Sequence, residues 1–108
     1  SLTEFALNYF KDEVEPKKKY KKPDAKEKIA IENLQKKLSF ISQDLKPEEI
    51  QTIVYSVGKE NGYENNLREW FKLIYEVLFG EINGPRMGFF ISFFGVKETT
   101  ELIKEKIK

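Results

Sequence analysis

Apolar side chains recur every three or four residues along most of the chain, and this spacing predicts amphipathic helices. The first such stripe lies in residues 2 to 14 and ends before Pro16. Apolar and polar residues nowhere alternate with period two over the length of a strand, so no sheet is expected. The pattern predicts an all-α bundle of five or six short helices, similar in class to other small helical bundles.

Cap and turn residues divide the chain into further helices. Asp24 and Glu27 have the spacing of a capping box, which predicts the start of a second helix. Pro47 predicts the start of a third, because proline is tolerated in the first turn of a helix. We expect that helix to end near Gly58 or Gly62, where glycine permits a left-handed backbone.

The second half of the chain contains three more predicted helices. Asn65 or Asn66 can cap the fourth, and Gly80 offers a closing residue. Pro85 marks the entry into a fifth helix, Gly95 marks its end, and a sixth follows. We therefore expect one domain over 1–108, with an entry helix and a lysine-rich linker in 1–23 and the bundle core in 24–108.

The fifth predicted helix is almost entirely apolar. Its large side chains are Met87, Phe89, Phe90, Ile91, Phe93 and Phe94. At 3.6 residues per turn they cover nearly the whole circumference, which predicts a central helix surrounded by its neighbours. Gly88 predicts that another helix approaches closely there, because only tight packing offsets the ~1 kcal/mol that glycine costs in a helix.

Composition excludes several classes of chemistry. The 108 residues include no cysteine and no histidine, and the formal net charge is +1. Disulfides, thiolate metal sites, typical zinc sites and catalytic triads are thereby excluded. The first residues lack the basic region and apolar run typical of a signal peptide, and no run of about 20 apolar residues occurs, so we expect a cytoplasmic protein without membrane contact.

The acidic residues do not predict a catalytic site. Asp44, Glu48 and Glu49 form a close acidic cluster, but they lie at a predicted helix start, where capping explains them. A small carboxylate-dependent enzyme is therefore a weak hypothesis. We expect no catalytic residue, no metal ligand and no cofactor in this chain.

A lysine-rich arm precedes the second helix. The run EPKKKYKKP, residues 15 to 23, has no apolar face and should lie extended over the surface. Its candidate RNA contacts are Lys17, Lys18, Lys19, Tyr20, Lys21 and Lys22. The lysines could neutralise phosphates and the tyrosine could stack on a base, but a solvated linker explains the run equally well.

Arg86 stands directly before the apolar fifth helix, where the positive end of the helix dipole disfavours a cation. A structural role would be a bond to Glu76, to Glu81 or to the carbonyls that end the fourth helix. A functional role would be contact with a phosphate or stacking on a base. The residues alone favour the structural role, because most arginines serve structure or solubility.

Other aromatic and basic residues also have both a structural and a functional interpretation. Trp70 and Tyr75 are expected in the core, because they lie on the apolar side of a helix. Tyr63 precedes that helix and is a better candidate for an exposed base-stacking ring. Arg68 could contact RNA or could pair with Glu64 four residues before it.

The C-terminal sequence resembles a known family. The run LREWFKLIYEVLFGEINGPRMGFFISFFGVKETTELI looks like the C-terminal end of the class I lysyl-tRNA synthetases. An aromatic helix there leads into G-P-R-x-G and a final helix. The upstream YFKDEVEPKKKYKKP resembles the same family, whereas residues 25 to 60 match only as amphipathic helices.

This resemblance implies an all-helical anticodon-binding domain, similar to the helical cage of the glutamyl-tRNA synthetases. It also implies lysine tRNA as partner, an N-terminal Rossmann-type catalytic domain that uses ATP, and a monomer. Neither the HIGH-like nor the KMSKS-like signature of that catalytic domain occurs in these 108 residues. The chain should therefore bind tRNA rather than charge it, and Arg86 gains weight as an RNA contact.

A helical protein-interaction module without RNA-binding function is the alternative. The surplus of aromatic residues and the near-neutral net charge favour it.

Overall fold

The computed structural model describes residues 20–108. This part of the chain consists of helices and loops without a strand, which confirms the predicted all-α class. The elements are α2 (Ala25–Ser39), α3 (Pro47–Gly58), the π-helical turn η3 (Lys59–Tyr63), α4 (Leu67–Phe79), α5 (Met87–Phe94) and α6 (Val96–Lys106). The helix expected over residues 2 to 14 lies outside the described residues. Within them, no helix has the length and apolar character needed to cross a membrane.

Side-chain caps begin two of the helices as expected. The Asp24 carboxylate accepts the Glu27 backbone N–H at 2.8 Å, and Glu27 accepts the Asp24 N–H at 3.0 Å. The Asn66 side chain accepts from the Glu69 N–H at 3.4 Å at the start of α4. These bonds satisfy donors that the first turn of a helix leaves without partners. Gly80 closes α4 with a left-handed backbone, φ 69°.

Gly58 and Gly62 have different functions at the end of α3. The chain continues through Gly58 into η3, and the helical path breaks at Gly62, where φ is 96°. Gly58 instead makes room for the Trp70 indole, because an added Cβ would lie 2.7 Å from Trp70 Cγ. The Trp70 Nε1–H donates to the Val54 carbonyl oxygen at 2.9 Å. This buried tryptophan, placed in the core as predicted, therefore joins α4 to α3.

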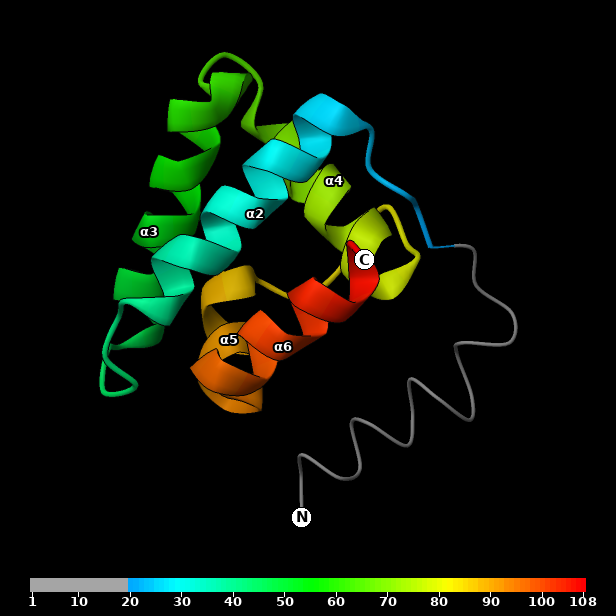
Figure 1. The fold of residues 1–108 in the computed structure, drawn as a ribbon. Helices are drawn as coiled ribbons and strands as arrows, with labels where there is room; N and C mark the ends of the chain where they lie inside the picture. Colours follow the sequence, from blue (N-terminus) through cyan, green and yellow to red (C-terminus); the bar gives the residue numbers. More distant parts are fainter. Residues whose placement is uncertain (1–19) are drawn as a thin grey trace.

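The helices pack around one core. Figure 1 shows α2 crossing the molecule between α3 and α4, with α5 and α6 below it. The most extensive contacts join α3 to α5 and α2 to α6. The core contains fully buried side chains from each of α2 to α6, including Leu34, Ile50, Ile74, Ile91 and Ile103.

The prediction that α5 is surrounded on all sides is wrong. Met87, Phe90 and Ile91 are buried, but Phe89 is 48% exposed and Phe93 is 56% exposed. Within residues 20–108, α5 packs mainly against α3 and leaves the side that carries Phe89 and Phe93 exposed. Its start also differs from expectation, because the Arg86 backbone is not helical (φ −59°, ψ 121°) and the helix begins two residues after Pro85.

Gly88 has the predicted packing role. An added Cβ at this position would lie 2.8 Å from the Gln51 backbone nitrogen and would also meet the Pro47 carbonyl oxygen. The Gly88 N–H donates to the Gln51 Oε1 at 2.6 Å in a buried bond. Glycine therefore allows the first turn of α5 to lie directly on the first turns of α3.

Gly88→Ala should lower the free energy of unfolding by about 1–3 kcal/mol, because the added methyl group forces α3 and α5 apart. Urea denaturation followed by circular dichroism measures this change. Ser92→Ala is the matched control, since Ser92 is exposed on the same helix and should change stability by less than about 0.5 kcal/mol. Equal stability of both variants would contradict the tight α3–α5 contact.

Candidate nucleic-acid interface

A depression of about 340 Å³ opens on the surface where α3, α4 and the turn before α5 meet. The turn provides Arg86 to it. Its lining comprises Gln51 and Tyr55 from α3, Phe71 and Tyr75 from α4, and Gly84 and Arg86 from the turn. Aromatic rings, one amide and one guanidinium are therefore brought together from segments far apart in the sequence.

Three rings form one wall of the depression. The Tyr55 and Phe71 rings meet edge to face with centroids 5.1 Å apart, and Phe71 and Tyr75 lie 6.4 Å apart. All three residues are partly buried. Burial raises the pKa of the Tyr75 hydroxyl, the Tyr55 hydroxyl adds to this effect, and the Arg86 charge lowers it. Aromatic faces beside a cation are suited to stacking on an unpaired base.

Gly84 places the turn directly against this wall. An added Cβ would lie 2.6 Å from Cδ1 of the Tyr75 ring and 3.2 Å from the Phe79 ring. Any side chain here would push the turn away from α4. Glycine thus brings Arg86, two residues later, to the edge of the aromatic wall.

The Arg86 side chain is exposed at the N-cap position of α5. Within residues 20–108, it forms no ion pair or hydrogen bond with Glu76, Glu81 or the carbonyls at the end of α4. The expected bond that would fix the turn is therefore not formed there. Its guanidinium is available to an external anion, and Gly84 and the α3–α5 contact determine its position.

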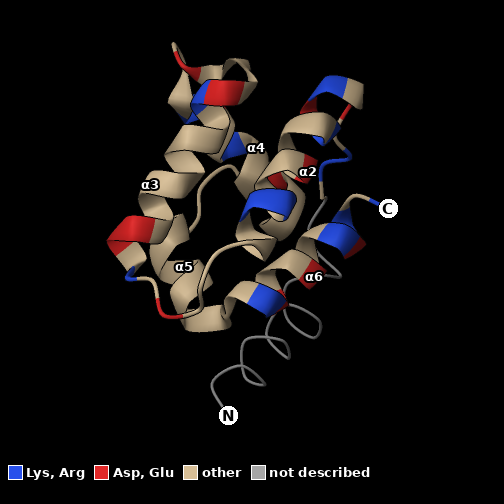
Figure 2. Cartoon of the chain, turned by 60° about the vertical axis from the view of Figure 1, so that its left-hand side comes forward, with Lys and Arg blue, Asp and Glu red and all other residues tan. Residues whose placement is uncertain are grey.

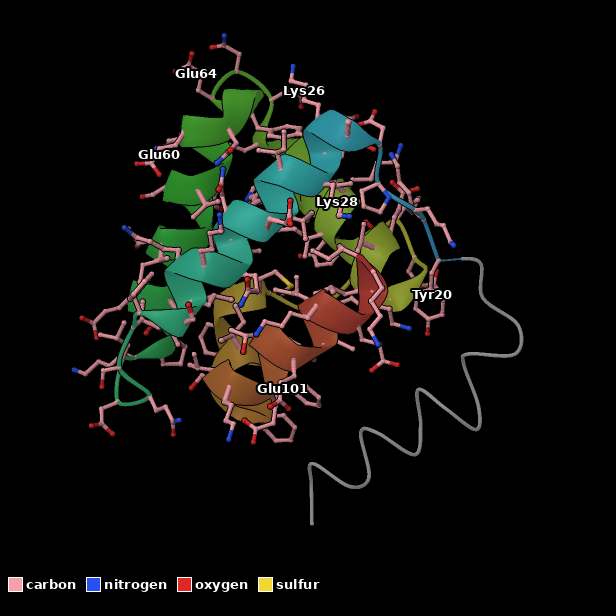
Figure 3. All side chains as sticks on the ribbon, viewed as in Figure 1. Tyr20, Lys26, Lys28, Glu60, Glu64 and Glu101 are labelled. Carbon is pink, nitrogen blue, oxygen red and sulfur yellow. The ribbon has the colours of Figure 1, made fainter. Side chains whose placement is uncertain are left out.

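The described end of the lysine arm is bound to the bundle. The Lys21 N–H donates to the Glu76 carbonyl oxygen at 3.0 Å, and the Lys21 ammonium pairs with Glu27 at 2.9 Å. The side-chain hydrogen bond from the Lys21 ammonium to Glu27 is the main cause of the raised Lys21 pKa. Tyr20, labelled in Figure 3, lies beneath the Lys106 ammonium, 3.7 Å from the ring centroid. Tyr20 and Lys21 therefore hold the arm against α4 and α6.

The remaining arm residues divide into two groups. Lys22 is exposed, so its ammonium group can reach an external phosphate. Lys17, Lys18 and Lys19 lie outside the described residues.

Tyr63 and Arg68 lie apart from the depression. Tyr63 is only partly exposed, because its ring packs against Trp70 with centroids 5.3 Å apart, and burial is the main cause of its raised pKa. The expected exposed stacking ring is thus half-covered by the core. Arg68 is exposed on α4, and in the described part of the chain it has no ion pair with Glu64. That pair is not favoured because α4 begins only at Leu67 and Glu64 points away from it (Figure 3).

Charge does not gather on one face in the view of Figure 2, where Lys and Arg alternate with Asp and Glu over α2, α3 and α6. The acidic residues at the start of α3 serve the helix, since Glu49 accepts the Lys46 N–H at 2.9 Å. Among residues 20–108, no group of three acidic side chains could hold a metal ion. The depression is thus defined by shape and aromatic character, with Arg86 as its cation.

Sequence reasoning found Arg86 but missed Gln51, Tyr55 and Phe71 as its neighbours. It also placed Tyr75 in the core, whereas that ring is partly buried at the edge of the core and lines the depression. The available signal for the missed neighbours was their position on α3 and α4 at the edge of the apolar stripes, where Tyr55 and Phe71 are half-buried and the polar Gln51 is buried. Only the packing of α3 beside α4 brings these edges together.

Comparison with known proteins gives one consistent result. The chain matches no protein-family model and no solved structure. Over 106 residues it is 41% identical to a lysine--tRNA ligase of Rickettsia felis, 42% to one of Rickettsia prowazekii and 40% to one of Rickettsia bellii. Each alignment covers 98% of this chain and 20% of the relative, so the chain spans about a fifth of the length of these curated relatives. Nearly all of this chain is therefore homologous to one segment of lysine--tRNA ligases.

Proposed function

We propose that this chain is the anticodon-arm-binding domain of a class I lysyl-tRNA synthetase. Two observations support the proposal: the similarity of 98% of the chain to lysine--tRNA ligases, and the aromatic depression beside Arg86. The second carries the RNA-binding function, because sequence-specific proteins bind RNA mainly through unpaired loop bases that stack on aromatic and guanidinium planes.

The depression suggests how a loop nucleotide would bind. Its base would stack against the wall formed by Tyr55, Phe71 and Tyr75, and the Arg86 guanidinium would contact the adjacent phosphate. Stacking on an aromatic ring contributes about 1–3 kcal/mol per base. A charge-assisted hydrogen bond to phosphate contributes about 1.5–3 kcal/mol.

The activity of the whole enzyme would lie elsewhere in the longer protein. In this proposal, an N-terminal Rossmann-type domain joins lysine to its tRNA with ATP, and the present chain orients the tRNA by its anticodon arm. The chain itself would need no cofactor. A cytoplasmic monomer without membrane contact completes the proposal.

One observation favours a protein-interaction module as a second candidate. The Phe89 and Phe93 rings lie four residues apart on α5 and are 48% and 56% exposed. Exposed neighbouring rings of this size are typical of protein contacts. If Phe89→Ser with Phe93→Ser abolished tRNA binding while Arg86→Ala had no effect, the proposed RNA site would be wrong.

Arg86→Ala should weaken binding of a lysine tRNA transcript about tenfold or more, because a phosphate contact is lost. Fluorescence anisotropy titration measures the affinity, and thermal melting measures stability. The melting temperature should stay the same, since the described structure shows no bond from Arg86 to the turn. Arg68→Ala is the parallel variant, and a smaller loss is expected because Arg68 lies outside the depression. Loss of stability with unchanged affinity would remove Arg86 from the site.

Replacing Lys17, Lys18, Lys19 and Lys22 with serine should weaken RNA binding and flatten its dependence on salt. Each lost single-strand phosphate contact lowers the slope of log affinity against log salt by ~0.7. Lys21 is kept because it pairs with Glu27. The control replaces four exposed lysines outside the arm, Lys26, Lys36, Lys37 and Lys59. The same slope in the arm variant and the unsubstituted chain would leave the arm as a linker.

A further inference from the structure

The side-chain amide of Gln51 is held in one orientation at the depression. Its oxygen accepts the Gly88 N–H at 2.6 Å, and Gln51 is only 5% exposed. A backbone N–H can only donate, so the atom that faces it must be the amide oxygen and not the nitrogen. Because this bond uses the amide oxygen, the NH2 group of Gln51 is the end that remains for other partners.

The amide NH2 group of Gln51 is left without a protein partner. Among residues 20–108, no hydrogen bond joins this nitrogen to another residue. In the same part of the chain, no fully buried side-chain nitrogen or oxygen lacks a partner. The nitrogen must therefore reach solvent. Because Gln51 is nearly buried and lines the depression, it reaches solvent there.

An NH2 group can donate hydrogen bonds but cannot accept them. We propose that Gln51 selects the base that enters the depression and favours a keto base, uracil or guanine, over an amino base, cytosine or adenine. This inference rests on the proposed RNA-binding function and names the chemistry of that same site. The selection of the base follows from the fixed orientation of the Gln51 amide. The only charged group that the proposed site uses is Arg86.

The shape of a nucleotide decides which base atom meets Gln51. Arg86 is exposed and Gln51 is nearly buried, and both line the depression, so a phosphate bound to Arg86 would leave the base pointing toward Gln51. The atoms farthest from the sugar are those at position 4 of a pyrimidine and position 6 of a purine. These are carbonyl acceptors in uracil and guanine, and amino donors in cytosine and adenine. Two donors that face each other cannot form a hydrogen bond, so an amino base would lose one hydrogen bond at this point.

The test compares oligo(U) with oligo(C) of equal length against the 108-residue chain by fluorescence anisotropy. The unsubstituted chain should bind oligo(U) about three- to tenfold more tightly, as one hydrogen bond provides. Gln51→Glu has nearly the same shape and still accepts the Gly88 N–H, but a carboxylate accepts from the amino group of cytosine. In this variant the preference should disappear or reverse.

Arg86→Ala is the second variant, and it separates failure of this inference from failure of the proposed function. It should weaken oligo(U) and oligo(C) by the same factor and leave their ratio unchanged. Equal binding of both oligonucleotides by the unsubstituted chain, with both weakened by Arg86→Ala, would overturn the role of Gln51 and keep the RNA site. No binding of either oligonucleotide, or of a lysine tRNA transcript, would overturn the proposed function itself. If Gln51→Glu lowers the melting temperature strongly, the ratio of oligo(U) to oligo(C) affinity in the unsubstituted chain decides whether Gln51 selects the base.

Discussion

The close contact of α5 with α3 is the constraint on which the rest of the structure depends. Gly88 has no Cβ, so the first turn of α5 lies on α3, and its N–H bonds the buried Gln51 amide at 2.6 Å. A buried amide costs free energy unless it forms a hydrogen bond. The bond between Gly88 and Gln51 therefore stabilises the close α3–α5 contact that the glycine makes possible. The start of α5 is therefore set by a residue of α3.

That contact also places the candidate site. Arg86 precedes Gly88 by two residues, and Gly84 lies against the Tyr75 ring of α4. The turn between α4 and α5 is thus held at both ends, and its guanidinium stands beside three rings from two helices. A cation at the N-terminus of a helix is electrostatically unfavourable on its own. In the proposed complex, a bound phosphate would compensate for this.

Local signals predicted helix ends well because caps and glycines act through their own backbone. The Asp24 capping box, the Asn66 cap and Gly80 all lie where the sequence indicated. The exposure of Phe89 and Phe93 was not predictable, because periodicity measures how apolar a helix is and not how many neighbours can cover it. The depression was missed for a similar reason. Gln51 and Arg86 are separated by 35 positions, and only tertiary packing brings them together.

The central claim is that a loop nucleotide binds between Arg86 and the aromatic wall. The most direct measurement is a nitrogen-15 NMR titration of the 108-residue chain with a stem-loop RNA carrying the anticodon loop of lysine tRNA. Our account predicts that the largest shifts occur at the amides of Gly84 and Gly88 and at the Arg86 side chain. Shifts confined to the exposed side of α5 around Phe93, or no shifts at all, would contradict it.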